Sequence, residues 1–268
     1  QARRTPVGPG LGDGVALASG TEPAALPPLP GAELLVRGGG PPGAVAGSPE
    51  VAARAAARLL TWMDARGWSG HDPFDLLLSP WAAPLRPFRW PSVVWVQLGK
   101  RSPVDLRPLL GVPPHENPKA LALGLEGCLA LTRGGDAPAR DAALRCAPGL
   151  LDRLLRAEVP GGGLGYPFPW ANRHFRAPEG TPSGVVTAFA TRALMAALDA
   201  AAHPGGDALL GAGATREWGV GGGVGGAAFA AERLRRVSTP LGPLLSYTPL
   251  DDRGVHNASV LAAAVLAR

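Results

Sequence analysis

The amino-acid sequence predicts an all-α fold, on three observations. Long segments carry apolar residues at helical spacing, whereas no segment shows the strict apolar–polar alternation of a half-buried strand. Some of these segments are apolar almost all round, and others on one face only. Two helix layers would explain this difference, because inner helices touch neighbours on every side and outer helices face water on one side. The economical architecture is an α/α toroid, a ring of helical hairpins.

The helix starts in the first half of the domain are marked by capping residues. Residues 48–50, Ser-Pro-Glu, combine a hydroxyl cap, a proline at the first helical position and an acid at the positive helix end, and Gly67 ends that helix. Residues 93–100 are apolar and fit either a helix or a strand. Asn117, followed by proline, repeats the capped start and predicts a buried helix over residues 120–131.

The second half continues the helical pattern. Residues 136–158 predict a helix in which Pro148 marks a kink or a break. Residues 181–202, opened by Thr-Pro, predict the longest helix, and residues 227–237 predict a short amphipathic one. Asn257 is the expected cap of a last helix, which is still apolar where the sequence stops. A helix ended in mid-run suggests that the ring is incomplete and that the protein continues beyond this chain.

The 268 residues divide into two regions of different composition. Residues 1–47 are mostly Gly, Pro and Ala without sustained periodicity, which predicts a disordered arm. Residues 48–268 carry the helical patterns and are the predicted toroid domain. Apolar residues make up 46% of the chain and charged residues 18%, so the composition permits a large core.

Charge, cysteine content and motifs indicate which binding partners, cellular compartment and cofactors to expect. The net charge is +5, but the basic residues are nearly all arginines scattered singly along helices, which argues against a nucleic-acid partner. The two cysteines suit a reducing compartment, and we expect a cytoplasmic protein. No run reaches the ~18 apolar residues of a membrane span. Phosphate-loop and HExxH motifs are missing, and we expect neither a cofactor nor a metal.

Three loops combine an aromatic or histidine side chain, a proline, and an acid or tryptophan. They are the first loop (residues 70–75), the central loop (164–182) and the third loop (246–252). In a ring of hairpins, the loops that precede successive inner helices lie on the same face. We therefore expect the three loops to meet at one face of the ring and to form a single binding site there.

The candidate site residues come mainly from these loops. Carboxylates and histidines for acid–base chemistry are Asp72, Asp75, His174, Glu179, Asp251 and His256. Side chains for stacking on sugar rings or for hydrogen bonding to them are Tyr166, Phe168, Trp170, Asn172, Arg173 and Asn257. Structural alternatives stay open. The aspartates can cap turns, and the aromatic rings can plug the end of the helix bundle.

The segment between the first two loops has a simpler interpretation. Arg101, Asp105 and Arg107 surround an irregular, proline-interrupted connection. We expect them to form a structural knot of ion pairs.

Four blocks of sequence, in order, resemble one group of bacterial proteins. They are HDPFDLLLSP (71–80), KRSPVDLRPLLGV with NPKALAL (100–123), GYPFPWANRHFRAPEGTP (165–182) and the C-terminal segment from Ser246. Proteins of this group often accompany polysaccharide-biosynthesis genes, and the resemblance implies an α/α toroid similar to six-hairpin glycosidases and terpenoid cyclases. The glycine-rich residues 204–226 depart from the group, which has more regular helix there.

The group often carries the label delta-aminolevulinic acid dehydratase, which the residues contradict. That enzyme is a β/α barrel with a Schiff-base lysine, whereas this chain has two lysines and no strand pattern. The resemblance therefore implies a fold but no activity.

The sequence predicts a carbohydrate-active protein. The chain would act on a polysaccharide or oligosaccharide as a hydrolase, with two of the carboxylates, or as a lyase or epimerase, with Arg173 neutralising a uronic acid and His174 or Tyr166 as base. A non-catalytic binding or assembly protein of polysaccharide biosynthesis is the first alternative. A terpenoid-cyclase-like enzyme is the second, although the adjacent Asp251 and Asp252 fall short of the aspartate motifs of those enzymes.

Overall fold

The computed structural model describes residues 48–158, 162–173, 175–203, 225–240 and 242–267. Of these residues, 61% are helical and 10% lie in strands or bridges, so the expectation of a mostly helical chain is confirmed. Three two-stranded antiparallel pairs correct the expectation that strands are missing. Each strand is only two to four residues long, too short to leave an alternating pattern in the sequence. The predicted arm and His174 lie outside the described residues.

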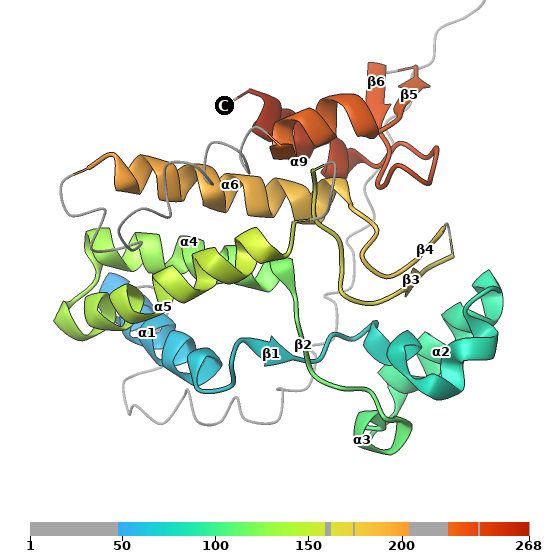
Figure 1. Ribbon diagram of the computed structural model, residues 1–268, viewed down its shortest axis with the longest axis horizontal. Coiled ribbons are helices and arrows are strands. Elements are labelled where there is room, and N and C mark those ends of the chain that lie inside the picture. Colours follow the sequence, from blue (N-terminus) through green and yellow to red (C-terminus); the bar gives the residue numbers. More distant parts are fainter. Residues whose placement is uncertain (1–47, 159–161, 174, 204–224, 241, 268) are drawn as a thin grey trace, which may run out of the picture. The chain divides into compact units, whose positions relative to one another are not determined.

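Five helices make up the core: α1 (Pro49–Asp64), α4 (Pro118–Gly134), α5 (Ala137–Arg156), α6 (Gly184–Ala201) and α9 (His256–Leu266). Helix α4 packs on α5 and α6, α1 packs on α5, and α9 packs on α6 (Figure 1). Leucines such as Leu125, Leu150 and Leu154 are completely buried between them, together with many alanines. Helix α4 contacts α1, α5 and α6, and α6 contacts α4 and α9, which explains why both helices are apolar on most sides.

Most helix starts follow the capping rules. The Ser48 hydroxyl accepts a hydrogen bond from Val51 N at 3.3 Å, and Asn117 Oδ1 accepts one from Lys119 N at 3.0 Å. Asp136 caps α5 in the same way, and this helix continues through Pro148 without a break. At 20 residues α5 is longer than α6, which has 18, so the prediction that α6 is the longest helix is wrong.

Two predicted helix starts are corrected by the structure. Helix α6 is capped by Ser183, whose hydroxyl accepts from Val186 N at 3.2 Å, and begins at Gly184. The Thr181 hydroxyl instead donates to the carbonyl of Pro178. Helix α9 has no side-chain cap, because Asn257 is already inside the helix and its Oδ1 accepts from the next residue, Ala258.

A second group of short helices follows the first loop: η2 (Asp75–Leu78), η3 (Pro80–Leu85), α2 (Arg89–Arg101) and α3 (Arg107–Leu110). The ambiguous residues 93–100 are therefore helical. Trp95 Nε1 donates to the carbonyl of Leu76 at 3.0 Å, which ties α2 to η2. A Cβ on Gly99 would lie 1.7 Å from Cδ1 of Leu76, so a larger residue there would displace the Leu76 side chain.

The strands link these elements in pairs. Strand β1 (Ser69–Gly70) pairs with β2 (His115–Glu116), so that Gly70 lies opposite His115. Strand β3 (Trp170–Ala171) pairs with β4 (Arg176–Ala177) inside the central loop, and β5 (Arg236–Thr239) pairs with β6 (Gly242–Leu245). The helix predicted over residues 227–237 is correspondingly shorter, ending in the π-helical turn η4 (Phe229–Arg233).

The exit from α1 depends on an unusual tryptophan. Trp68 has a φ of +59°, rare for a residue with a large side chain, and its ring is 4% exposed. Its Nε1 donates to Asp64 Oδ1 at 3.2 Å. A Cβ on Gly124 of α4 would lie 2.6 Å from the Trp68 ring, so the ring occupies the space that a glycine leaves. Burial of the ring therefore holds the left-handed backbone that leads into β1.

Within the described ranges, α6 is the one helix long and apolar enough to cross a membrane. Its most apolar window is 56% buried by the rest of the fold. A core helix of a globular domain meets the same criterion, so α6 is weak evidence for a membrane span.

Candidate functional site

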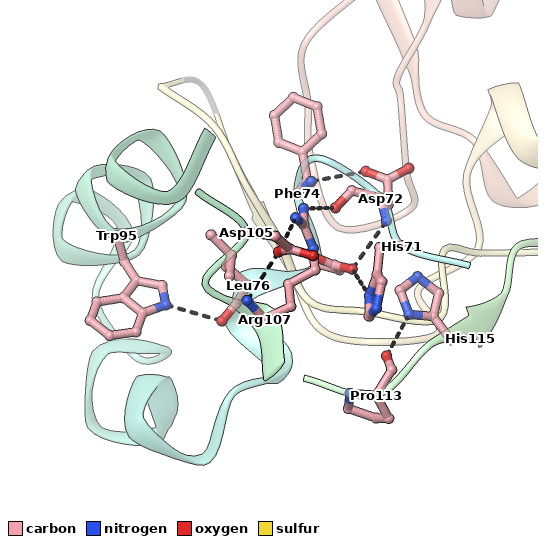
Figure 2. A network of polar contacts seen from close by, with 10 residues as sticks. His71, Asp72, Phe74, Leu76, Trp95, Asp105, Arg107, Pro113 and His115 are labelled. Atoms are coloured by element: carbon pink, nitrogen blue, oxygen red, sulfur yellow. Dashed lines mark hydrogen bonds and ion pairs between the residues drawn. The ribbon is translucent and has the colours of Figure 1, made fainter. Parts of the chain in front are cut away.

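The first loop is folded around the carboxylate of Asp75, whose side chain has no exposed surface. Its Oδ2 accepts a hydrogen bond from Asp72 N at 3.0 Å and lies 3.1 Å from His71 Nδ1. Its Oδ1 accepts from Arg107 Nε at 2.8 Å (Figure 2). A buried carboxylate is stable only when paired and hydrogen-bonded, and Asp75 meets both conditions.

Arg107 connects this loop to the helical segment after α2. Its Nη2 donates to the carbonyl of Asp72 at 2.9 Å, and its Nη1 donates to Asp105 Oδ1 at 3.1 Å. The predicted ion-pair knot is thus present for Arg107 and Asp105, but it is centred on Asp75. Arg101 is exposed at the end of α2.

The Asp75 carboxylate orients the His71 ring. A carboxylate only accepts hydrogen bonds, so Nδ1 of His71 carries the hydrogen and Nε2 is the nitrogen that accepts a proton. The His71 side chain is 32% exposed. The ring of His115 lies edge-on to it at 6.5 Å between centroids, placed there by the pairing of Gly70 with His115 (Figure 2).

Asp72 is the half-buried carboxylate of the loop. Burial raises its pKa, and the negative charge of Asp75 raises it further, although the hydrogen bond from Phe74 N to Oδ1 at 2.9 Å opposes the shift. Asp72 therefore keeps a proton at higher pH than an exposed aspartate does. Asp72, with its raised pKa, directly follows His71 in the sequence.

The aromatic rings bring the three loops together. Phe74 of the first loop lies 6.0 Å from Trp170 of the central loop, and Trp170 lies 5.0 Å from Tyr247 of the third loop, between ring centroids. His115 lies 5.3 Å from Phe168, which stacks on Tyr166 at 5.3 Å. A continuous set of ring contacts thus runs from His71 to the start of α6.

Two tyrosines in this set share a polar contact. The side chains of Tyr166 and Tyr247 are hydrogen-bonded, and Tyr247 is also bonded to Ser183, the cap of α6. Burial raises the pKa of both phenols, so both stay protonated at neutral pH. The charge of Asp72 acts on Tyr166 in the same direction, which places these two groups within electrostatic reach.

Asp251 organises the third loop by itself. It is 8% exposed, and its Oδ2 accepts from the amide and the hydroxyl of Thr248, each at 2.7 Å. Its Oδ1 accepts from the amides of Tyr247 and Arg253 at 3.3 and 3.2 Å. With its oxygens bound in this way, Asp251 holds the loop rather than offering a carboxylate to a ligand.

The other predicted site residues are dispersed. Phe168 is only 3% exposed, so it supports the other rings and offers no face to a sugar. Asn172 Oδ1 accepts from Phe175 N at 2.8 Å and thereby shapes the turn between β3 and β4. The remaining described candidates are exposed, on that turn, after β4 or in the first turn of α9: Arg173, Glu179, His256 and Asn257.

Sequence reasoning did not select several residues that build the site: His71, His115, Arg107 and Tyr247. His71 and Tyr247 lie inside the predicted loops, but a single histidine or tyrosine carries no pattern of its own. Arg107 is 32 residues from Asp75, and His115 reaches the site only through a two-residue strand pair.

Metal binding and cysteine chemistry find little support in the part of the chain that is described. No group of three or more His, Cys, Asp or Glu side chains there could hold a metal ion. Cys128 and Cys146 are buried, and burial raises the pKa of Cys128 to about 12, so that thiol is a poor nucleophile. No family model, curated protein or solved structure matches the chain.

Proposed function

We propose that this chain is a carbohydrate-active enzyme of the lyase or epimerase type, acting on a saccharide that contains a uronic acid. The observation that carries the proposal is the first loop, in which His71 is oriented by the buried Asp75 next to Asp72, a carboxylate of raised pKa. We further propose that the described helices belong to an α/α toroid, as the four sequence blocks imply.

In this proposal His71 is the base and Asp72 the acid. His71 Nε2 takes the proton from the carbon next to the sugar carboxylate. The electron pair of the broken C–H bond then forms a double bond between this carbon and its neighbour. The bond from the neighbouring carbon to the glycosidic oxygen breaks, and this oxygen takes the proton of Asp72. In an epimerase, the same carbon would instead be reprotonated on its other face.

Electrostatics favour this assignment of roles. In such a site the donor must keep its proton until the reaction, and the acceptor must present a nitrogen without a hydrogen. Burial and the charge of Asp75 raise the pKa of Asp72, which suits a proton donor, while the hydrogen bond between Nδ1 and Asp75 leaves Nε2 of His71 to accept a proton. Arg173 remains the proposed partner of the sugar carboxylate.

Hydrolysis is less well supported than elimination. A glycosidase needs two carboxyl groups at roughly 5 to 10 Å across the bond that is cut. Of the four predicted carboxylates, Asp75 and Asp251 are bound inside their loops and Glu179 is exposed. Among these four carboxylates, Asp72 alone combines partial burial with a raised pKa. The other three therefore do not supply the second carboxyl group that hydrolysis needs.

A non-catalytic carbohydrate-binding protein is the second candidate. The rings of Tyr166, Trp170, Phe175 and Tyr247 pack on one another at 5.0 to 5.6 Å between centroids. Such mutual packing is what the alternative of an aromatic plug requires. If the rings only close the end of the bundle, exposed groups at its rim would bind a ligand without reaction.

The test is a panel of uronic-acid polysaccharides and oligosaccharides. Elimination is followed by the ultraviolet absorbance of the unsaturated product, and epimerisation by uptake of solvent deuterium next to the carboxylate. We expect His71→Gln to lower turnover by about 10²–10⁴-fold, as for loss of a general base. The matched control is His203→Gln, which changes an exposed histidine at the end of α6.

Two results would contradict the enzymatic proposal. One is turnover that survives in His71→Gln at the wild-type rate. The other is binding of a saccharide by the wild type with neither product nor deuterium uptake, which would support the second candidate. A control on the geometry is the nitrogen NMR spectrum of His71, which should show the Nδ1–H tautomer in the wild type and its loss in Asp75→Ala.

A further inference from the structure

Helix α2 is apolar on two opposite faces, and only one of them is covered. Its inner face, with Ser92, Val96 and Gly99, packs against η2 and η3. On the outer face, Trp90, Val94 and Leu98 follow one another at intervals of four residues and are 56, 54 and 64% exposed. Residues at this spacing lie on one side of a helix and form a single stripe.

Further exposed apolar side chains lie close to this stripe in the sequence. Seven of the fifteen exposed large apolar side chains of the described residues lie between residues 81 and 109. Besides the three on α2, they are Trp81, Phe88, Val104 and Leu109. Isolated exposed apolar residues need no explanation, but a gathering on one short segment marks a contact surface.

The charged residues on α2 and directly before it have one sign, whereas Asp105 and Arg107, which follow α2, form an ion pair. Residues 79–104 contain Arg86, Arg89, Lys100 and Arg101 and no acidic residue. Arg86 is fixed by donating to the carbonyls of Leu77, Leu78 and Ser79, and the Arg89 guanidinium lies 5.3 Å from the Trp90 ring. Arg101 is exposed at the far end of the stripe. Both ends of the apolar stripe are therefore basic.

We propose that the outer face of α2 docks on an anionic lipid membrane. Trp90, Val94 and Leu98 would enter the boundary between headgroups and acyl chains, while Arg89 and Arg101 bind lipid phosphates. An apolar stripe with tryptophan and a basic border is the pattern of helices that lie in the membrane interface. With 13 residues, α2 is too short to span the bilayer, so it lies parallel to the surface.

A protein partner is less consistent with the charges. Such a partner would need an acidic border around an apolar groove, whereas an anionic bilayer supplies both at any position. This inference does not depend on the proposed reaction, because α2 contributes no side chain to the pair of His71 and Asp72.

The experiment is co-sedimentation of the full chain with phosphatidylcholine vesicles, with and without phosphatidylglycerol. We expect binding to the anionic vesicles, weaker binding at high salt, and little binding to the neutral ones. The triple variant Trp90→Gln, Val94→Gln, Leu98→Gln should bind at least tenfold more weakly. Its unfolding midpoint should stay close to that of the wild type, because all three side chains face outward.

A control with the same composition is available on α1. Val51, Leu59 and Trp62 are 40, 55 and 55% exposed, but that helix also carries Glu50 and Asp64. The triple change of these three residues to Gln should leave vesicle binding unchanged. An equal loss in both triple variants would overturn the assignment to α2.

Other occupants of the face give different results. If wild type fails to sediment with anionic vesicles but forms a dimer that the α2 variant abolishes, the face binds a second copy and the proposal is wrong. If only a chain lacking residues 1–47 binds the vesicles, those residues occupy the face, which also overturns membrane docking by the full chain.

Discussion

The first and third loops each fold around a buried aspartate, yet the two aspartates have different partners. Asp75 is bound by a guanidinium from another segment, by an imidazole and by one amide. Asp251 is bound by three amides and one hydroxyl, all within four residues of it. In the sequence the two positions look alike, since each is an acid close to a proline and an aromatic residue.

The difference in hydrogen-bond partners suggests different roles for the two buried carboxylates. The donors around Asp251 are neutral amides and one hydroxyl, which satisfy its charge. The partners of Asp75 include His71, whose second nitrogen remains directed away from the carboxylate. This difference in partners is the reason why the proposed reaction is assigned to the first loop and not to the third.

The largest expected effect comes from removing the charge of Asp75. Asp75→Ala leaves Arg107 without its main partner, and breaking a buried ion pair costs about 3–5 kcal/mol of unfolding free energy. We expect about 3 kcal/mol, because the Arg107 side chain is 18% exposed. Denaturant unfolding followed by circular dichroism measures the loss.

A double variant checks that the cost comes from the unpaired charge. Asp75→Ala with Arg107→Met removes both charges and should be more stable than Asp75→Ala alone. If the double variant is less stable by the sum of the two single losses, Asp75 and Arg107 act independently and the comparison with Asp251 fails.

A smaller effect is expected for Asp251→Asn. The amide group of Asn replaces one acceptor oxygen by a donor, so buried donors such as Thr248 N lose their partner. An unsatisfied buried donor costs roughly 1–3 kcal/mol. Unfolding should report this loss, and the tautomer of His71 should be unchanged. A change of that tautomer would show that the third loop also orients the acid–base pair.

The smallest effect has the opposite sign. The folded-state pKa of Asp72 is raised, so its contribution to stability is complete below the unfolded pKa of about 3.9 and is lost as the pH rises towards the folded value. Asp72→Asn does not titrate and should therefore be more stable than wild type at pH 7. A gain of about 1 kcal/mol would raise Tm by roughly 2–4 °C.

Thermal unfolding at pH 4 and pH 7 separates this effect from packing. We expect the gain in Tm at pH 7 to shrink at pH 4, while turnover is lost at both. A variant that is less stable than wild type at pH 7 would show that the carboxylate of Asp72 contributes to stability in its charged form.

The fold was predictable where the signal is local. Ser48 and Asn117 were recognised as caps because the capping hydrogen bond reaches only two or three residues along the chain. At the start of α6, Thr181 and Ser183 are both hydroxyl residues two positions apart, and only the contacts of the folded loop decide between them. The short strand pairs were missed because strands of two residues are too short to show the apolar–polar alternation of a β-strand.

The site was predictable only in part, for the same reason. The three loops could be selected by composition, and their rings do touch. The roles of the acids depend on partners distant in sequence, such as Arg107 for Asp75, and on burial. Composition cannot separate a carboxylate that holds a loop from one that carries a proton.

The glycine at position 124 has a consequence for the position of His71. It leaves room for the Trp68 ring, and that ring fixes the left-handed turn from which residues 69 and 70 lead to His71. The position of His71 thus depends on a glycine in α4 that is more than fifty residues away in the sequence. An alanine at position 124 would place its Cβ 2.6 Å from the Trp68 ring, so we expect it to displace this ring and the segment that leads to His71.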